Sequence, residues 1–519
     1  MKSSLSLKLS GKQQGELFAD ILLVCIVILG SFLRFYHIDK RCLSGDGIVT
    51  IEIASQPSAK AVWQKVVQDY PSDLPFFYAL LHYWLLLGKS VFWLRFLSAL
   101  SGILVILLSY KLSKYLFDRK TALLVSFLVA TSSFRVLYNQ TVRYYSLNGL
   151  LNLLSLYFFI TALQNNRISK WLSYLITRTT SLYINYSSFL FFIPEIFFII
   201  FYRIKYAKSF KRWLFCFIAI FILWLPMRGL FIRDLALLLS GDGFERVPLY
   251  LGPLGNLIYF FFTFSVGKTI SPFNYPVIAV AVITYLIILV SFFRAFSLGK
   301  FPREPVIFIM SSLIITTALC AFSNYNSPRY IMASGVLYSI IISLGILSIP
   351  RKKIVLFLII VISMLRFYAL YNLYNERQYR TMELVDDWDE IASFADSKAG
   401  PYDIIIYNSN AFAYYLNKIN SQNNAYKLPD NEEDMRVFLR ERESYKTLQI
   451  ILVDSPLSGN NLEIYQEELA LLRDWLKRNN FKLVNTQPFD KDPEAEIKRK
   501  YLKRYFPEYR TTVYMYSRN

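Results

Sequence analysis

Four short segments carry residues whose types suit chemistry, and each lies next to a long apolar block. The first reads LSGDGIVTIEIAS at residues 43–55, where Asp46 stands between Gly45 and Gly47. Glycines let a backbone approach a ligand closely, and a carboxylate in such a loop can take a proton from a hydroxyl group. The same Gly-Asp-Gly sequence is also common in ordinary turns, so the local sequence leaves both a catalytic carboxylate and a simple turn open.

The second segment, YPSDLPFFYALLHYW at residues 70–84, contains Asp73 and His82 as its polar members. Pro75 is typical of the first turn of a helix, and Asp73 is well placed to cap it. We therefore expect Asp73 to be a helix cap and His82 to be a structural side chain rather than a base.

The third and fourth segments each place an arginine beside a tyrosine at the start of an apolar block. Arg143 and Tyr144 lie in NQTVRYYSL, and Arg329 and Tyr330 lie in SPRY. A guanidinium group matches phosphate oxygens well, although snorkelling beside interfacial tyrosines explains Arg143 equally well. Arg95, farther upstream, is expected to pair with a loop carboxylate.

The elements that must position these residues are membrane helices. The chain has 519 residues, of which 55% are hydrophobic in long blocks and 18% are charged, against roughly 25% charged residues in soluble domains. The net charge of +20 comes largely from short loops between apolar blocks, which indicates a topogenic role and not nucleic-acid binding. Two histidines and four scattered cysteines predict no metal site of their own, but they leave a carboxylate-held divalent cation open.

Apolar blocks of spanning length predict an α-helical polytopic membrane protein with about 11 transmembrane helices. Every second loop is basic, so the N-terminus is expected in the cytoplasm and the C-terminus outside. The expected spans are 17–35, 96–112, 121–138, 146–163, 171–187, 188–203, 213–229, 275–293, 305–322, 330–349 and 354–372.

The composition changes after the last apolar block, which divides the chain into two expected domains. Residues 1–372 are predicted to form the transmembrane module, with outer-face loops at 36–95 and 229–274. Residues 373–519 are predicted to form a small extracytoplasmic α/β domain without a glycine-rich phosphate loop. Its expected elements are strands at 402–407, 448–453 and 513–516 and a helix at 462–478.

Taken in order, the motifs resemble those of the GT-C superfamily of polyprenyl-phosphate-sugar glycosyltransferases. The resemblance is closest to the branch of protein O-mannosyltransferases and aminoarabinose transferases. It rests on LSGDGIVT, SDLPFFYALLHYW, LRFLSALSG, QTVRYYSL, SPRY and DWDEIASF, which follow one another in the family's order. In three places the chain departs from the family pattern. Gly47 stands where the family has a glutamate, Ser72-Asp73-Leu74-Pro75 replaces His-Pro-Pro, and Thr141 replaces the glutamate of the arginine motif.

The resemblance implies a GT-C-like membrane glycosyltransferase that moves a sugar from a polyprenyl-phosphate donor to an acceptor hydroxyl with inversion. The acceptor is a glycan, a lipid or a protein, and a divalent cation stays open. By the same resemblance Asp46 is the general base, while Arg143 and Arg329 bind the donor phosphate. Further candidates for the pocket, including a second acid, are Glu52, Asp73, Tyr78, His82, Gln140, Tyr144 and Tyr330.

Two other functions are compatible with many spans and basic loops. A flippase or transporter of lipid-linked glycans would place charges along a path through the membrane, where Glu195 and Arg178 are the main central charges. A receptor-like scaffold would use the C-terminal domain as a binding module. The expected location is an integral protein of a bacterial inner (plasma) membrane, with the C-terminal domain on the extracytoplasmic side.

Overall fold

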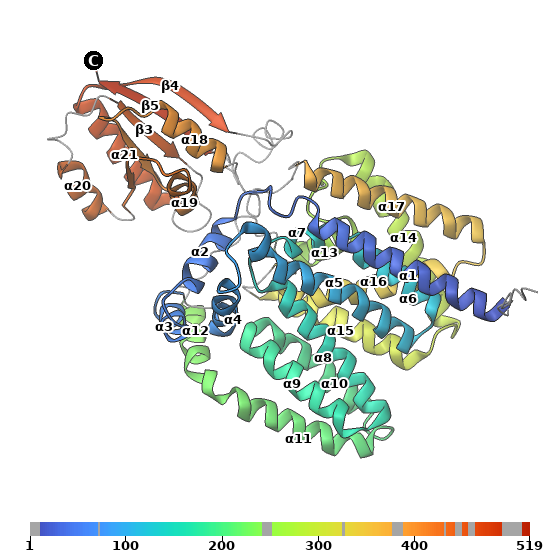
Figure 1. Cartoon of the computed structure of the whole chain (residues 1–519). Coiled ribbons are helices and arrows are strands. Elements are labelled where there is room, and N and C mark those ends of the chain that lie inside the picture. Colours follow the sequence, from blue (N-terminus) through green and yellow to red (C-terminus); the bar gives the residue numbers. More distant parts are fainter. Residues whose placement is uncertain are drawn as a thin grey trace, which may run out of the picture.

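In the computed structural model, the part of the chain up to Tyr374 forms a helical bundle, and the part from Trp388 forms a small sheet with helices at one end of that bundle (Figure 1). The bundle is the larger part, as the long apolar blocks predicted. The structure describes residues 11–70, 73–240, 252–323, 327–375, 388–429, 432–441, 449–454, 462–489 and 511–518.

Among the described residues, eight helices are long and apolar enough to cross a membrane. Large apolar side chains such as Phe32 and Phe215 are exposed on their outer surfaces, as expected of helices that face lipid. These helices are α1 (Gly11–Phe35), α5 (Val91–Leu116), α8 (Tyr145–Asn165), α11 (Ala207–Trp224) continued by η2 (Leu225–Met227) and α12 (Arg228–Ser240), α14 (Tyr275–Ser297), α15 (Arg303–Phe322), η3 (Pro328–Ile331) with α16 (Met332–Leu347), and α17 (Lys352–Tyr374).

A bent pair of helices brings the number to nine if the two are counted as one span: α6 (Arg119–Ala130) and α7 (Ser133–Asn139) meet at 58°. The other two expected spans fall on shorter helices, α9 (Ile168–Ile184) with 17 residues and α10 (Phe192–Phe201) with 10. The sequence there is mostly apolar, but Asn185 has an extended backbone and caps the short helix η1 (Tyr186–Phe191). This cap ends α9 and divides the apolar stretch.

Three short helices connect α1 to α5 at the end of the bundle that faces the sheet (Figure 1). They are α2 (Gly45–Ala54), α3 (Ala59–Asp69) and α4 (Pro75–Leu85). Serine hydroxyls cap the first two, and proline starts the third without a side-chain cap. A further apolar helix, α13 (Gly252–Val266), precedes α14, and residues 241–251 of the expected outer loop 229–274 lie outside the described part of the chain.

The C-terminal region is a five-stranded mixed sheet with helices, in the strand order β2-β1-β3-β5-β4. The first three strands in this order are parallel, and β5 pairs antiparallel with both β3 and β4. The expected strands and helix are confirmed, whereas β2 and β4 were missed because β2 is a half-exposed edge and β4 is polar and contains a proline. The elements are α18 (Trp388–Lys398), β1 (Ile404–Tyr407), α19 (Asn410–Lys418), β2 (Asn424–Lys427), α20 (Glu432–Glu441), β3 (Gln449–Asp454), α21 (Leu462–Arg478), β4 (Phe481–Phe489) and β5 (Thr511–Arg518).

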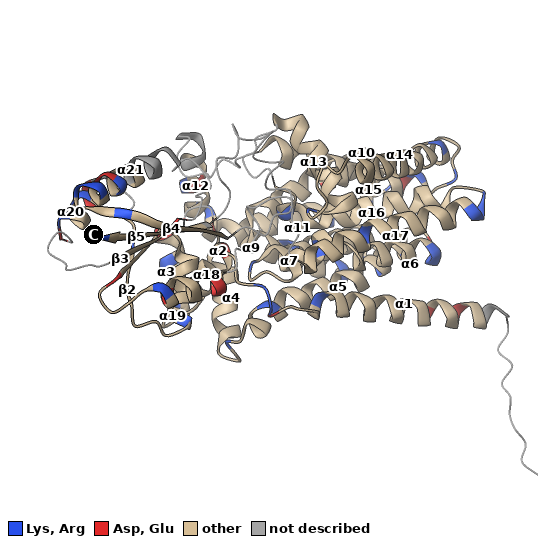
Figure 2. Cartoon of the chain, turned by 90° about the horizontal axis from the view of Figure 1, so that it is seen from above, with Lys and Arg blue, Asp and Glu red and all other residues tan. Residues whose placement is uncertain are grey.

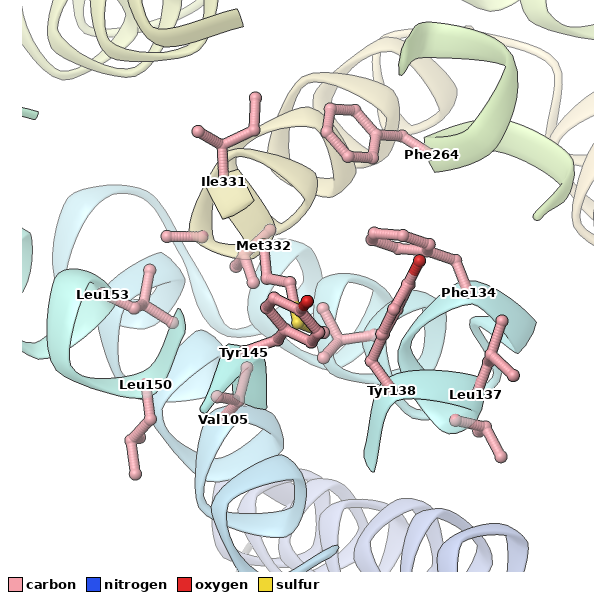
Figure 3. Close-up of a cluster of buried hydrophobic side chains, with 14 of the residues drawn as sticks. Val105, Phe134, Leu137, Tyr138, Tyr145, Leu150, Leu153, Phe264, Ile331 and Met332 are labelled. Atoms are coloured by element: carbon pink, nitrogen blue, oxygen red, sulfur yellow. The ribbon is translucent and has the colours of Figure 1, made fainter. Parts of the chain in front are cut away.

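The core of the bundle lies where α5, α7, α8, α13 and α16 meet, around the buried rings of Tyr138 and Tyr145 (Figure 3). Helix α8 approaches α16 closely because residue 149 is glycine. A Cβ atom on Gly149 would lie 2.9 Å from the Cβ atom of Met332. Small residues permit such close helix packing in membranes. Because Arg143 precedes α8 and Arg329 precedes α16, this close packing also brings the two arginine segments together.

Candidate active site

Asp46 lies in the first turn of α2, where the N-terminus of the helix is capped by the preceding serine. The hydroxyl of Ser44 accepts a hydrogen bond from the Gly47 amide at 3.2 Å. The side chain of Asp46 is 48% exposed, so its carboxylate is accessible from outside the bundle. Acidic side chains in a first helical turn are stabilised by the positive end of the helix dipole.

Arg143 lies between α7 and α8, and its guanidinium group contacts four side chains. Its Nη1 donates to the hydroxyl of Tyr78 at 2.6 Å and to that of Thr50 at 3.2 Å. The same nitrogen lies 3.5 Å from Oδ2 of Asp73, and Nε lies 3.7 Å from Oδ2 of Asp46. These contacts hold Arg143 against Asp46 from the first segment and Asp73 from the second.

Arg329 approaches the same carboxylate from η3, which lies almost 300 residues after Asp46 in the sequence. Its Nη1 lies 3.8 Å from Oδ2 of Asp46. The guanidinium group sits over the ring of Tyr145, with 5.1 Å between the guanidinium carbon and the ring centroid, and it lies 5.3 Å from the ring of Tyr330. The structure therefore brings Asp46, Arg143 and Arg329 together, although they come from three distant segments.

The two guanidinium groups determine the charge state of Asp46. Arg143 is the main cause that lowers the pKa of this carboxyl below its usual value, Arg329 adds to it, and partial burial opposes both. Burial also raises the pKa of Tyr78 well above its usual value, so its phenol keeps its proton beside Asp73. The site therefore holds an ionised Asp46 between two cations at neutral pH.

Asp73 differs from the expectation that it would cap a helix. The cap position of α4 is Leu74, which makes no side-chain cap hydrogen bond. Asp73 instead accepts a hydrogen bond from the hydroxyl of Tyr78 at 2.5 Å and pairs with Arg143. The capping prediction was wrong because a nearby guanidinium group is a stronger partner for a carboxylate than the backbone amides at the start of α4.

The remaining pocket candidates lie at the edge of this cluster or away from it. Glu52 is half exposed and pairs with Lys65 at 3.5 Å, on a different side of α2. Nδ1 of His82 is 2.9 Å from the carbonyl of Ala54, which is a structural contact. Gln140 braces the chain after α1, because its amide donates to the carbonyls of Arg34 and Tyr36 at 3.0 Å. Tyr144 and Tyr330 are neighbours of the two arginines.

Two residues of the cluster were missed from the sequence, and one partner was assigned wrongly. Thr50 links Asp46 to Arg143, since its hydroxyl donates to the Asp46 carbonyl at 2.7 Å and accepts from Arg143. Tyr145 lies under Arg329. The spacing of Asp46 and Thr50, four residues apart in a helix, was the only available signal for Thr50. Among the described residues Arg95 forms no salt bridge with a carboxylate; it donates to three backbone carbonyls.

Within the described residues there is no group of three or more histidine, cysteine, aspartate or glutamate side chains placed to hold a metal ion. Asp46 and Asp73 are the two carboxylates of the cluster, and both contact Arg143. Their charges are therefore balanced by guanidinium groups in this structure.

Arg178 and Glu195, the central membrane charges noted in the sequence, bind each other. Both side chains are fully buried and form an ion pair. Glu195 also accepts from the hydroxyl of Tyr174 at 2.6 Å, and Arg178 donates to Asn152 at 2.9 Å. This network satisfies both charges inside the bundle, which is how charged groups persist in a membrane interior.

The fold and the cluster define a class of protein, namely a polytopic membrane protein with an acid and two arginines at the end of the bundle that faces its C-terminal sheet. Comparisons with known proteins bear on the fold and on the family it resembles. The family model described as dolichyl-phosphate-mannose-protein mannosyltransferase matches residues 71–228. None of the curated proteins matches the chain.

Among solved structures, the chain is similar to ArnT from Cupriavidus metallidurans in the apo state. The TM-score is 0.60 at 12% sequence identity, covering 96% of this chain and 98% of that one. ArnT from the same organism bound to undecaprenyl phosphate gives a TM-score of 0.53 at 12% identity, with 97% and 98% covered. The family model and the fold thus confirm the resemblance to membrane glycosyltransferases of the GT-C type.

The buried pair of Arg178 and Glu195 yields a test of stability. Replacing Glu195 by Gln leaves a buried guanidinium without its counter-charge, which typically costs about 3–5 kcal/mol. We expect Glu195→Gln to lower the melting temperature of the detergent-solubilised protein markedly. In the exposed pair of Arg478 and Asp474, Arg478→Ala is expected to change stability by only about 0–1 kcal/mol.

Thermal unfolding followed by intrinsic fluorescence measures both variants. Equal melting temperatures for Glu195→Gln and the native protein would mean that the pair is not buried as described.

Proposed function

We propose that this protein is a glycosyltransferase that moves a sugar from a polyprenyl-phosphate donor to the hydroxyl of a glycan, lipid or protein acceptor on the extracytoplasmic face of a membrane. The observation that carries the proposal is the Asp46 carboxylate, held 3.7 Å from Arg143 and 3.8 Å from Arg329. This arrangement combines a proton acceptor with two cations suited to a phosphate group.

The two arginines are the proposed contacts of the donor phosphate. Nε of Arg143 is buried and makes no hydrogen bond within the described residues, so a donor remains for a ligand oxygen. Arg329 stands opposite it across Asp46. The similar ArnT structure bound to undecaprenyl phosphate supports a lipid phosphate as the ligand class. Guanidinium groups would stabilise the negative charge that grows on the departing phosphate.

Asp46 is the proposed general base. Its carboxylate takes the proton of the acceptor hydroxyl while that oxygen forms a bond to the anomeric carbon. The bond from the anomeric carbon to the phosphate oxygen breaks, and its electron pair leaves with the phosphate. Attack from the face opposite the leaving group inverts the configuration at that carbon. One carboxylate and one displacement are sufficient for this reaction.

The ion pairs of Asp46 give this carboxylate two roles, as a counter-charge before the donor binds and as a proton acceptor during the reaction. Without donor, Asp46 neutralises two guanidinium groups that would otherwise repel each other. A bound phosphate would take over both cations, and the main cause of the lowered pKa of Asp46 would weaken. The carboxylate would then become more basic when the donor is in place, which suits a general base.

Asp73 and Tyr78 are proposed to hold Arg143 in place. Tyr78 donates to Asp73 and accepts from Arg143, so the three groups form a closed set of contacts. Gly47 stands where the family has its second acid. Asp73 is the acid that contacts Arg143 in addition to Asp46. Glu52 pairs with Lys65, which makes it the weaker candidate for a second acid. A divalent cation bound together with the donor phosphate stays a prediction.

The orientation in the membrane is part of the proposal. Several Lys and Arg positions, coloured blue on the ribbon, lie at the end of the bundle opposite the C-terminal sheet (Figure 2), which supports a cytoplasmic side there. The cluster around Asp46 and the C-terminal sheet would then both be extracytoplasmic, in a bacterial inner membrane. We propose the transmembrane module as residues 1–372 and the C-terminal domain as residues 373–519; residues 376–387, just past this boundary, lie outside the described part of the chain.

The transport and scaffold alternatives are less well supported. A flippase would need unpaired membrane charges along a path, whereas Arg178 and Glu195 bind each other. A scaffold would not need an acid between two arginines. An assay of native membranes with a radiolabelled polyprenyl-phosphate sugar separates the three, because only the enzyme forms a new glycoside.

The base is tested by replacing Asp46 with its isostere. Asp46→Asn removes the proton acceptor but keeps the shape, so we expect transfer to fall about 10²- to 10⁴-fold. Asp69→Asn, on the neighbouring helix α3, removes an exposed carboxylate that contacts Lys65 and is expected to retain native activity. Transfer by Asp46→Asn at the native rate would exclude the base role.

A second prediction concerns the dependence of the reaction on pH. Because Arg143 and Arg329 lower the pKa of Asp46, this carboxyl stays ionised until the pH falls below the usual range of carboxyl groups. The acid limb of kcat/KM, which reports the free enzyme, is therefore expected below that range. Arg329→Gln removes one cation, raises the pKa of Asp46 and shifts the limb to higher pH. A limb that does not move in this variant contradicts the pairing.

Donor binding is tested at the two arginines. Hydrogen bonds to charged groups contribute about 1.5–3 kcal/mol, so Arg143→Gln and Arg329→Gln are each expected to lower kcat/KM for the donor by roughly 10- to 100-fold. Arg167→Gln changes an exposed arginine in a basic loop and is expected to leave this constant unchanged. Donor titrations in detergent or in nanodiscs provide the measurement, and equal constants for all three variants would refute the phosphate role.

A further inference from the structure

The segment between α1 and α2, which leads to Asp46, is held on the bundle side by Arg95, in addition to the contacts of Gln140 with Tyr36 and Arg41. Arg95 on α5 is buried, and its guanidinium group donates to the carbonyls of Ile38 at 2.5 Å, Arg41 at 2.9 Å and Cys42 at 2.8 Å. These three hydrogen bonds, from two nitrogens of one guanidinium group, fix the path of this segment against the bundle. All three acceptors are backbone carbonyls.

The same segment is held from the other side by the C-terminal region. The amide of Leu43 donates to the hydroxyl of Tyr415 on α19 at 2.8 Å. The thiol of Cys42 lies 3.1 Å from Oδ1 of Asp389 on α18. Leu43 and Tyr415 are 1% and 4% exposed, so water does not replace this hydrogen bond. This hydrogen bond joins residues that are 372 positions apart in the sequence, and Leu43 lies three residues before Asp46.

The hydrogen bond between Leu43 and Tyr415 lies next to the start of α2, the helix that carries Asp46. Leu43 directly precedes Ser44, which caps α2, and Asp46 lies in the first turn. The apolar face of α19, with Phe412, Tyr415 and Leu416, is buried in the same hydrophobic cluster as Leu43. Any shift of Leu43 moves the cap, and the cap moves Asp46 relative to the two arginines. A displacement near 1 Å at a reacting group can cost about 10²-fold in rate.

We infer that Tyr415 is a positioning residue for Asp46, so that the C-terminal domain takes part in the reaction by setting the general base. This inference rests on the proposed function. Tyr415 touches neither substrate nor reacting atoms; it acts through the Leu43 amide. The C-terminal domain therefore affects the rate of sugar transfer through the position of Asp46, and not only the binding of the acceptor.

The test compares two tyrosines that are neighbours on α19. Tyr415→Phe removes the hydroxyl that accepts from Leu43 and keeps the ring. Tyr414→Phe changes the adjacent, half-exposed tyrosine, for which the structure shows ring packing against Tyr415 at 5.2 Å between centroids. Both variants, native protein and Asp46→Asn are purified as full-length chains and assayed with radiolabelled polyprenyl-phosphate sugar.

Tyr415→Phe is expected to lower kcat roughly 10- to 100-fold and to leave KM for the donor within about twofold, because the contacts of Arg143 and Arg329 do not involve Leu43. Hydrogen exchange in residues 36–46 is expected to accelerate in this variant, while exchange in β1 stays unchanged. Tyr414→Phe is expected to match the native protein in all three measurements. A purely structural role would instead reduce the folded fraction and leave kcat per folded molecule intact.

Native kcat in Tyr415→Phe, or an equal loss in Tyr414→Phe, overturns the positioning role. If Asp46→Asn is inactive while Tyr415→Phe is native, this inference alone fails and the proposed function stands. If Asp46→Asn transfers sugar at the native rate, the proposed base role fails, and the positioning role fails with it.

Discussion

A single carboxylate between two guanidinium groups is the interaction on which the remaining structure depends. Arg143 and Arg329 carry like charges at neighbouring helix entrances, and the ion pairs with Asp46 at 3.7 Å and 3.8 Å offset their repulsion. Because the cluster is only partly exposed, these charges interact more strongly than they would in water. The two guanidinium groups also suit a phosphate ligand. The same pair of positive charges therefore explains both the need for the Asp46 carboxylate and the proposed binding of the donor.

Helix packing inside the membrane places the two cations. Gly149 lets α8 approach α16 closely, which aligns the segments that precede both helices. The hydroxyl of Ser187 donates to the carbonyl of Tyr330 at 2.9 Å and thereby fixes the backbone next to Arg329. Ser187 in turn accepts from Asn148 on α8 at 3.4 Å. Buried polar contacts of this kind orient the segments, because an unsatisfied polar group in a membrane interior is costly.

Much of the fold followed from patterns that are local in the sequence. Long apolar blocks with alternating basic loops predicted a polytopic helical bundle, and short β-branched runs predicted the central strands β1 and β3. The count of spans differed, because length and hydropathy do not register the cap that Asn185 forms within an apolar stretch. Asp73 was assigned to a cap for the related reason that the sequence contains no information on the guanidinium that reaches it.

The sequence by itself determined the residue types and their neighbours: an acid between glycines, two Arg-Tyr pairs at span entrances, and a polar domain after the last span. Only the tertiary structure decided which of these meet. It joined Asp46 to two arginines, separated Glu52 from them, and brought Tyr415 to Leu43 across 372 positions. The physical reason is that hydropathy and turn signals act over a few residues, whereas ion pairs and buried hydrogen bonds depend on distances that helix packing sets.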